Sequence, residues 1–323
     1  MRRQGQRAIA VVTTLSVGGL VTLGLLAVCF AQRDQGAAQL TPTATEALQV
    51  LLTTSELVVG ANRFAFGLLK DGKLLADARV TVRVYALQNE DACLVAETPA
   101  RYHALEVISQ GKHVHIHPDG SRHVHGAATD VQGIYVGQVT FARPGAWGVE
   151  VLAQLGDGRA EGARLSVDVL PVSRTPMPGT LAPRSRNLIA ADVIDLRTID
   201  SSEPPDPRLH QTRIADAIAQ GKPQVIVFAT PRYCTSRVCG PVVDVVRTLI
   251  PTYSDRVVFV HQEIWEAGSL QRFSPTVEEW NLRSEPWIFV VDGGGIVRAR
   301  FEGLTTRREL EAALRRVLGP ERR

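Results

Sequence analysis

The sequence is short of lysine and methionine. Only four of its 323 residues are lysine and only two are methionine, although Lys and Arg together (36) slightly outnumber Asp and Glu (33). The net charge of +3 is small and no basic stripe is interleaved with aromatic residues, which argues against a nucleic-acid partner. The scarcity of methionine argues against a thioether site for Cu(I). With 45% hydrophobic residues, the chain is long enough for two globular domains.

Charge is also absent from a long stretch near the N-terminus. Residues 8–32 are uncharged and mostly apolar, and they lie between Arg7 and Arg33. About twenty apolar residues suffice to cross a bilayer as a helix, whereas the apolar core of a signal peptide is usually about 7–15 residues long. The segment therefore predicts a transmembrane anchor rather than a cleaved signal. Arginines on its short N-terminal side predict a single-pass protein of the cell membrane, with the bulk of the chain extracytoplasmic.

Cysteine is scarce as well. Of the four cysteines, Cys29 lies in the apolar segment, where LLAVCF raises the alternative of lipidation; Val28 counts against it, because a lipoprotein cleavage site needs a small residue there. Disulfides persist outside the cytoplasm, so the other three cysteines predict one pair and one leftover. Cys93, in EDACLVAE, is predicted to be a small buried apolar residue, which leaves Cys234 and Cys239 as the pair.

The stretch from residue 41 to residue 172 has the alternation of β-strands. Segments such as NRFAFGLL, ARVTVRVYAL, GIYVGQVTFA and WGVEVLAQL alternate apolar and polar residues, with KDGK, ARPGAW and GDGRA as turns. Many short strands without helical periods between them predict an antiparallel β-sandwich. The stretch GIYVGQVTFARPGAWGVEVLA resembles the end of the immunoglobulin-like domains in YtkA-like and FixH-like extracytoplasmic proteins.

Two further regions follow. Residues 173–207 are rich in proline, which breaks regular elements and predicts a linker draped over the second domain. From residue 208 to residue 320 helix and strand patterns alternate, which predicts a three-layer α/β domain. The expected helices are QTRIADAIAQG, PVVDVVRTLIPTY, PTVEEWNL and TRRELEAALRRVLG, and the expected strands are PQVIVFAT, RVVFVHQEIW, PWIFVVD and IVRARFEG.

The order of these elements resembles the thioredoxin fold. The resemblance covers roughly residues 214–318 and rests on an apolar strand, a cysteine pair that opens a helix, a proline before a later strand, a hairpin and a terminal helix. It implies that Cys234 is the exposed nucleophilic cysteine and that Pro286 is the cis-proline that faces the cysteines. The chain departs from the family in two ways. QVIVFAT lacks the family's buried acid, and CTSRVC places four residues between the cysteines instead of two.

The wider spacer sets a geometric condition. Five positions along an α-helix amount to about 500° of turn and about 7.5 Å of rise, which is too far for a disulfide. Part of CTSRVC is therefore expected outside the helix, which is expected to begin near Pro241 because proline is favoured in the first turn. The helix dipole, Arg232 and Arg237 predict a lowered pKa for whichever thiol is exposed. CGP also begins at Cys239, so which cysteine attacks stays open, and a structural disulfide is the alternative to a reactive one.

With the family's acid missing, a general base for thiol exchange has to come from elsewhere. His261 and Glu263 are two residues apart and share one face of a predicted strand, near the end where open α/β sheets place their sites. Both are candidate bases. The alternative is a histidine whose hydrogen bonds are satisfied within the sheet.

Five of the eight histidines fall within HVHIHPDGSRHVHG. Alternation places His113, His115 and His117 on one face of a strand and His123 and His125 on one face of the next. A two-residue Asp-Gly turn would send the two sets to opposite faces, whereas a three- or five-residue connection would pair His117 with His123 and His115 with His125 and gather all five on one face. Gathered, they predict a nitrogen-rich site for Cu(II), Zn(II) or Ni(II); the alternative is a solvated His-rich tip without a specific ion.

Two classes of function follow. The first is a membrane-tethered thiol-disulfide oxidoreductase that acts on extracytoplasmic protein thiols or disulfides and requires no cofactor for the exchange. The second is a copper-binding metallochaperone or sensor. SCO-type proteins also place a cysteine pair and a histidine on a thioredoxin-like scaffold, and Cys234, Cys239 and His261 imitate that set, although SCO-type pairs have three intervening residues and a later histidine. Peroxide reduction, suggested by ATPRYC, lacks the expected Pro-x-x-x-Thr-x-x-Cys arrangement.

Overall fold

The structure is a computed structural model that describes residues 48–76, 78–88, 91–105, 133–234, 238–267 and 269–319, together with two strands at 113–116 and 122–125. Most of the regular structure is β-sheet, arranged as one large sheet and two smaller ones. The segment at 8–32 that predicts a membrane anchor lies outside these residues. Within the part of the chain that is described, no helix combines the length and the apolar character needed to cross a bilayer.

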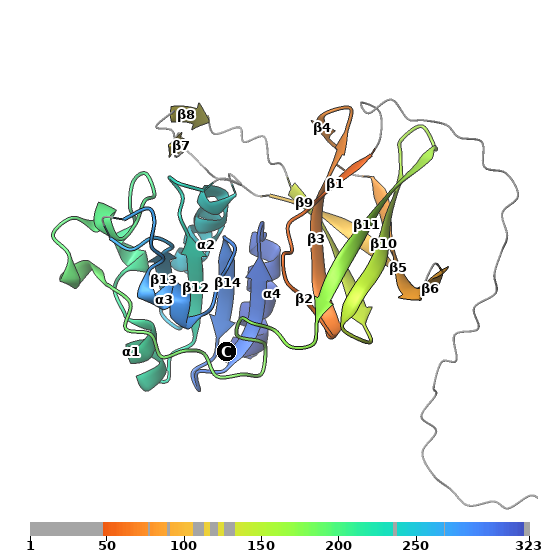
Figure 1. The fold of residues 1–323 in the computed structure, drawn as a ribbon. Coiled ribbons are helices and arrows are strands. Elements are labelled where there is room, and N and C mark those ends of the chain that lie inside the picture. The colour runs from red at the N-terminus through yellow and green to blue at the C-terminus, as the bar shows by residue number, and fades with distance from the viewer. Residues whose placement is uncertain are drawn as a thin grey trace, which may run out of the picture. The chain divides into compact units, whose positions relative to one another are not determined.

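The largest sheet contains nine strands from the first half of the chain (Figure 1). In chain order they are β1 (Gln49–Leu52), β2 (Leu57–Val58), β3 (Gly60–Lys70), β4 (Lys73–Leu74), β5 (Arg79–Gln88), β6 (Asp91–Ala104), β9 (Gly133–Phe141), β10 (Gly145–Gln154) and β11 (Ala160–Leu170). Paired strands run antiparallel, except that β2 is parallel to β11. Side chains alternate between inside and outside, as in β5, where Val80, Val82 and Val84 are buried.

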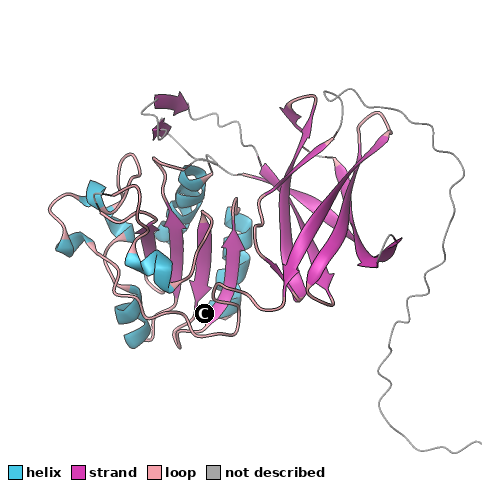
Figure 2. Cartoon of the chain, viewed as in Figure 1, coloured by secondary structure: helices cyan, strands magenta, loops and turns pink. Residues whose placement is uncertain are grey.

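The long strand β6 joins two halves of this sheet. Its residues 91–100 pair with β5 and its residues 101–104 pair with β9, so the sheet folds over and the two inner faces share one core (Figure 2). Aromatic side chains fill part of that core. Phe66 stacks on Tyr135 with 5.8 Å between ring centroids, and Phe141 meets the edge of Trp147 at 5.3 Å.

The second half of the chain holds a four-stranded sheet in the order β13-β12-β14-β15. Its strands are β12 (Gln224–Ala229), β13 (Val258–Glu263), β14 (Trp287–Val291) and β15 (Val297–Glu302). β12 is parallel to β13, and the remaining pairs are antiparallel. Four helices accompany the sheet: α1 (Ile214–Ala219), α2 (Cys239–Tyr253), α3 (Pro275–Glu279) and α4 (Arg307–Leu318).

Helices cover both faces of this sheet, because β12 contributes side chains to two separate cores (Figure 1). Every residue of β12 is buried. Val225 and Val227 pack with residues of α2 and α4, whereas Ile226 and Phe228 pack with residues of α1 and α3. The sheet therefore lies between two helical layers, as the alternation of helix and strand predicts.

The proline-rich segment after β11 is more regular than expected. It contains three short 3-10 helices, η1 (Ala190–Asp192), η2 (Leu196–Thr198) and η3 (Pro207–Leu209), so the expectation that proline breaks every regular element is wrong there. The segment follows the edge of the four-stranded sheet. The N–H of Gly179 donates to the carbonyl oxygen of Val297 at 2.8 Å, and the N–H of Ala182 donates to that of Gly295 at 2.9 Å.

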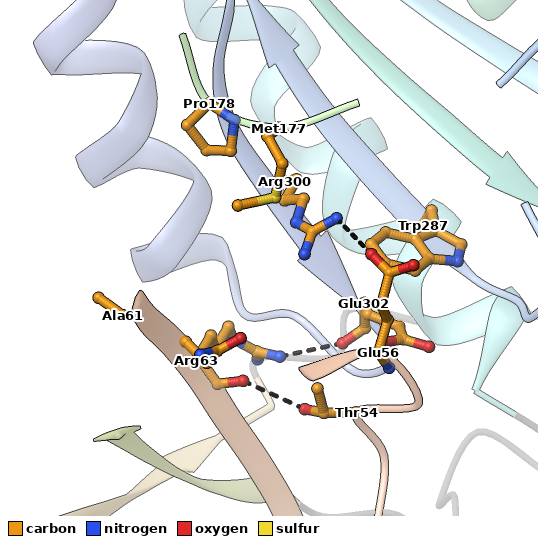
Figure 3. A pocket seen from close by; sticks show the side chains of 10 residues that line it. Thr54, Glu56, Ala61, Arg63, Met177, Pro178, Trp287, Arg300 and Glu302 are labelled. Atoms are coloured by element: carbon orange, nitrogen blue, oxygen red, sulfur yellow. Dashed lines mark hydrogen bonds and ion pairs between the residues drawn. The ribbon is translucent and has the colours of Figure 1, made fainter. Parts of the chain in front are cut away.

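A largely buried arginine of β3 connects the nine-stranded sheet to the second half of the chain. Arg63 donates to the Glu309 carboxylate at 2.8 Å, to the carbonyl oxygen of Glu302 at 3.0 Å and to that of Leu304 at 2.7 Å. These bonds border a small cavity of about 130 Å³ (Figure 3). The guanidinium is fully engaged by protein groups, so we interpret the cavity as part of a structural contact.

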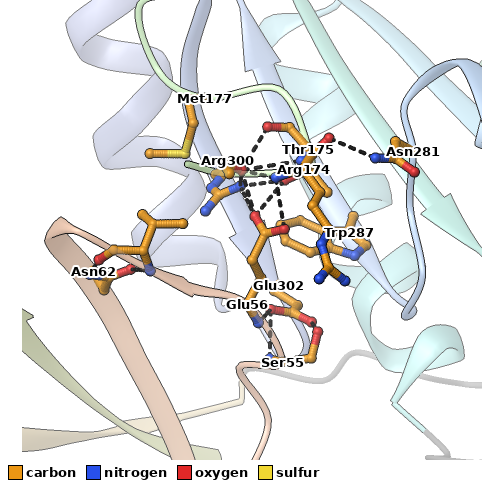
Figure 4. A network of polar contacts seen from close by, with 12 residues as sticks. Ser55, Glu56, Asn62, Arg174, Thr175, Met177, Asn281, Trp287, Arg300 and Glu302 are labelled. Carbon is orange, nitrogen blue, oxygen red and sulfur yellow. Dashed lines mark hydrogen bonds and ion pairs between the residues drawn. The ribbon is translucent and has the colours of Figure 1, made fainter. Parts of the chain in front are cut away.

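A second arginine reinforces that contact from β15. Arg300 donates to the Glu56 carboxylate at 3.0 Å and to the Ser173 hydroxyl at 2.8 Å, and its guanidinium lies 5.5 Å from the centre of the Trp287 ring (Figure 4). Burial opposes ionisation of Glu56, but the hydrogen bonds from Ser173 and Arg300 hold the pKa of that carboxyl below its usual value. The network therefore fixes how β1 to β3 contact β14 and β15.

Candidate dithiol site

Cys234 and Cys239 lie at the carboxyl end of β12 and at the start of α2. A turn closed by the N–H of Tyr233 and the carbonyl oxygen of Thr230, 3.1 Å apart, leads from the strand to Cys234. Cys239 is the first residue of the helix. Neither cysteine is disulfide-bonded, and the two sulfurs lie within 4.8 Å of one another. The helix begins two residues before Pro241, so the expected loop contains Cys234 but not Cys239.

Neither thiol is exposed. Cys234 is 3% exposed and Cys239 is 0% exposed, so the expectation of an exposed nucleophile at Cys234 is wrong for the free protein. Burial raises the pKa of Cys239 well above its usual value, and the neighbouring Cys234 raises it further. The expected lowering of a thiol pKa by arginine finds no support in Arg232, whose guanidinium donates to Glu203 at 2.7 Å. Arg237 lies outside the described residues.

The peptide bond before Pro286 is cis, as predicted. The residue before it, Glu285, brings an acid into the site: its carboxylate, the Cys234 sulfur and the Cys239 sulfur all lie within 4.8 Å of one another. Its buried Oε2 has no hydrogen-bond partner in the part of the chain that the structure describes. Burial, the charge of Cys234 and the charge of Glu263 raise the pKa of Glu285 to about 9, so the group is protonated at neutral pH.

Glu285 is a candidate site residue that the sequence analysis missed, because it lies outside the strand β12, where an acid was expected. The sequence does place an acid directly before Pro286, in SEPW. Glu285 thus places a carboxyl group beside the sulfurs, although QVIVFAT contains none.

His261 lies in a buried ion pair with an acid of the proline-rich segment. Its Nδ1 is 3.3 Å from Oδ1 of Asp200, and both side chains are fully buried. Burial lowers the pKa of His261, but the Asp200 charge and hydrogen bond outweigh this and raise it. Asp200 also accepts the N–H groups of Ser202 and Asp206 at 2.8 and 3.0 Å and lies 3.1 Å from Nε2 of His210. Although burial opposes ionisation, these partners hold the pKa of Asp200 far below its usual range.

One peptide group links this ion pair to the dithiol. Nε2 of His261 donates to the carbonyl oxygen of Ala229 at 3.0 Å. The N–H of the same peptide, which belongs to Thr230, donates to the Cys239 sulfur and lowers its pKa against the effect of burial. A donor on the carbonyl oxygen polarises the peptide and strengthens its N–H as a donor. His261 therefore acts on Cys239 through a peptide and not as a base in contact with the sulfur.

Glu263, the second candidate base, is also engaged elsewhere. Its carboxylate accepts the N–H of Ser201 at 2.9 Å and the N–H of Ile264 at 3.0 Å. The Ser201 hydroxyl in turn accepts the N–H of Arg232 at 3.3 Å. His261 and Glu263 do share a strand face, but that face holds the segment around Asp200 against the sheet. The prediction that they are general bases is unsupported by these contacts.

The histidine-rich stretch forms a separate two-stranded sheet of β7 (His113–Ile116) and β8 (Arg122–His125). His113 pairs with His125 and His115 pairs with His123. The register differs by two residues from the predicted pairing of His115 with His125. His117 lies outside the described residues.

Cys93 differs from its prediction. It is disulfide-bonded, and it is half-buried rather than buried. Its neighbours on β6, Leu94 and Val95, are 50% and 43% exposed, so this part of the strand faces no core. The assignment of Cys93 as the leftover, apolar cysteine is therefore wrong, and Cys234 and Cys239 are the cysteines without a disulfide bond among the described residues.

Two groups of described side chains could hold a metal ion, each with three ligand atoms within 4.8 Å of one another: Asp200, His210 and His261, and Cys234, Cys239 and Glu285. Both sets are compatible with copper or zinc. In the first group, both Asp200 oxygens already accept hydrogen bonds, which an ion would have to displace. The second group offers two sulfur ligands and a carboxylate oxygen without a partner.

No family model matches the sequence, and no curated protein is similar to it. Three solved structures superpose weakly. Murine CRIg has 13% identity and a TM-score of 0.21, over 39% of this chain and 98% of that one. The soluble domain of PmoD from Methylocystis sp. ATCC 49242 (Rockwell) has 12% identity and a TM-score of 0.20, over 38% and 90%. The purple acid phosphatase PPD1 from yellow lupin (Lupinus luteus) seeds has 10% identity and a TM-score of 0.25, over 66% and 29%. Superpositions this poor carry no argument about fold or function.

Proposed function

We propose that the protein is a thiol-disulfide oxidoreductase, with Cys234 and Cys239 as its redox pair. The observation that carries the proposal is a pair of cysteines, not disulfide-bonded, whose sulfurs lie within 4.8 Å of one another at the junction of a buried strand and a helix. In this proposal residues 8–32 anchor the chain in the membrane, and the partner is a protein dithiol or disulfide on the extracytoplasmic side. Thiol exchange needs no cofactor.

The same proposal assigns a thioredoxin-like fold to residues 208–320 and an immunoglobulin-like sandwich to residues 41–172. The first assignment is supported by the strand order β13-β12-β14-β15 with helices on both faces and the cysteines between β12 and α2. The second is supported by the folded-over, mainly antiparallel sheet. Residues 173–207 connect the two.

Within the pair, we assign the attack on a partner disulfide to Cys234 and the resolution of the mixed disulfide to Cys239. Cys239 is fully buried in the first turn of α2 and its thiol has a raised pKa, which suits a group that reacts second. Cys234 precedes the helix and is slightly exposed, at 3% against 0% for Cys239.

The test is the reduction potential of the Cys234/Cys239 pair in the full chain, set by glutathione buffers and read by alkylation and mass spectrometry. We expect a reversible two-electron transition between about −120 and −270 mV, the range of exchange enzymes. The C239S variant should trap glutathione on Cys234, and C234S is the matched control that should not. A potential below about −300 mV would identify a structural disulfide instead. Copper held tightly and stoichiometrically by the reduced thiols would favour metal delivery.

A metal site on the histidine hairpin is a second candidate function, favoured by the pairing of His113 with His125 and of His115 with His123. Imidazole suits Cu(II) and Zn(II), and the site would serve a metallochaperone or a sensor. Titration of the full chain with each ion, compared with a variant carrying alanine at all five histidines, tests this. Equal affinity in the two proteins would end the metal hypothesis.

A further inference from the structure

Among the described residues, Glu285 differs from the nearby acids Glu263 and Asp200 because its buried Oε2 has no hydrogen-bond partner. Glu263 is held by two backbone N–H groups and Asp200 by two N–H groups and two imidazoles. A buried carboxyl oxygen without a partner is costly, so its presence calls for an explanation. Among the described residues, the titratable groups near it are Cys234, Cys239 and the Glu263 carboxylate.

The carboxyl of Glu285 and the sulfur of Cys234 cannot easily carry a negative charge at the same time. Two like charges in a buried site disfavour each other, as in acid dyads that share one proton. When the Cys234 sulfur loses its charge by forming a mixed disulfide, one cause that keeps the proton on Glu285 disappears.

We propose that Glu285 is the catalytic acid and base of the dithiol, which gives a proton to the partner's leaving thiolate and then takes the proton of Cys239. The proposal rests on the oxidoreductase function proposed above. It gives the unpartnered carboxyl oxygen a role beside the sulfurs, which neither His261 nor Glu263 can fill because both are bound elsewhere.

The steps balance as follows. The Cys234 thiolate attacks one sulfur of a partner disulfide, the partner S–S bond breaks, and the departing thiolate takes the proton of Glu285. The Cys239 thiol then gives its proton to the Glu285 carboxylate while its sulfur attacks the Cys234 sulfur. The mixed disulfide breaks and the partner leaves as a second thiolate, which is protonated by water. The partner gains two electrons, the cysteine pair loses two, and Glu285 ends protonated, as it began. Oxidation of a partner is the reverse sequence.

The experiment follows the two steps separately in the full chain. Reduced protein is mixed with glutathione disulfide and quenched with acid, and mass spectrometry counts the glutathione adduct on Cys234 and the internal disulfide. In Glu285→Gln we expect adduct formation within a fewfold of wild type and resolution slowed about 100-fold, so that the adduct accumulates. Glu285→Asp, which keeps the carboxyl, should recover part of the rate. The matched control is Glu266→Gln, which removes an acid from a partly exposed surface pair with Arg272.

The outcomes separate the two proposals. If wild type forms neither an adduct nor an internal disulfide, the oxidoreductase function fails. If wild type cycles normally and Glu285→Gln resolves the adduct at the wild-type rate across pH 6 to 9, the function stands and the role of Glu285 is overturned. A rate that falls in Glu285→Gln without any change in its pH profile would assign Glu285 a structural role only.

Discussion

Two carboxyl groups in the second half of the chain, the buried Asp200 and the half-buried Glu285, have opposite protonation states. Asp200 is surrounded by donors, two backbone N–H groups and the imidazoles of His210 and His261, and it stays ionised. Glu285 has two sulfurs for neighbours and an unpartnered oxygen, and it stays protonated. A saturated charge holds a structure together, whereas a neutral acid beside a thiol is free to exchange its proton. We therefore assign a structural role to Asp200 and proton transfer at the dithiol to Glu285.

The largest expected effect comes from removing the Asp200 charge. Asp200→Asn should destabilise the protein by about 3–5 kcal/mol, because a buried His261 charge loses its partner. The pKa of Asp200 is lowered in the fold, so its contribution is present above about pH 4 and is lost as the pH falls. The pKa of His261 is raised, so its contribution is present below about pH 6.5 and is lost as the pH rises. Urea unfolding should therefore show the largest difference between about pH 4 and pH 6.5.

The control for this prediction is Asp195→Asn, because Asp195 pairs with Arg197 at the surface and is 46% exposed. Its loss should leave the stability nearly unchanged. If both variants lose the same small amount of stability, the view of Asp200 as a scaffold charge is wrong.

A smaller effect of opposite sign is expected at Glu285. Its pKa is near 9 in the fold and near 4.3 when unfolded, so the unfolded state releases the proton first and stability falls as the pH rises between these values. In the reduced protein, Glu285→Gln should remove this loss and stabilise the fold by on the order of 2 kcal/mol at pH 8. Urea unfolding of the two reduced proteins from pH 5 to pH 9 checks this. Parallel curves would mean that Glu285 is ionised in the fold.

The smallest effect tests the link between the Asp200–His261 pair and Cys239, which runs through the peptide of Ala229 and Thr230. His261→Gln keeps a donor for the Ala229 oxygen but removes the positive charge, so resolution of the glutathione adduct by Cys239 should slow about threefold, as expected for one weakened hydrogen bond. His210→Gln alters the other imidazole near Asp200, which has no bond to Ala229, and should leave the rate unchanged. Equal rates in both variants would show that the peptide carries no effect.

Local patterns predict most of the scaffold. Alternation and helical periodicity predict β12 to β15 and the four helices. Each of these elements buries one face or both, and the spacing of its own apolar residues shows which. The spacer CTSRVC predicts that the helix starts after Cys234, and it begins at Cys239. The cis-proline at Pro286 follows from the resemblance to thioredoxin.

The chemistry of the site is less local. Asp200 lies in a proline-rich stretch that predicts a linker. Nothing in that stretch predicts its contact with His261, which lies on β13. The pKa of Glu285 depends on sulfurs that are distant in sequence. Arg232 is near Cys234 in sequence, but its guanidinium pairs with Glu203. The charge states of Asp200 and Glu285 depend on partners that are distant in sequence, which local periodicity does not predict.

The protonation of Glu285 in the reduced protein is tested most directly by a redox difference infrared spectrum of the full chain. Such a spectrum reports protonated carboxyl groups through their C=O stretch. The account predicts such a band in the reduced protein that shifts when Cys234 and Cys239 form a disulfide, disappears in Glu285→Gln and persists in Asp200→Asn. A reduced protein without this band, or a band that disappears with Asp200 instead, would contradict it.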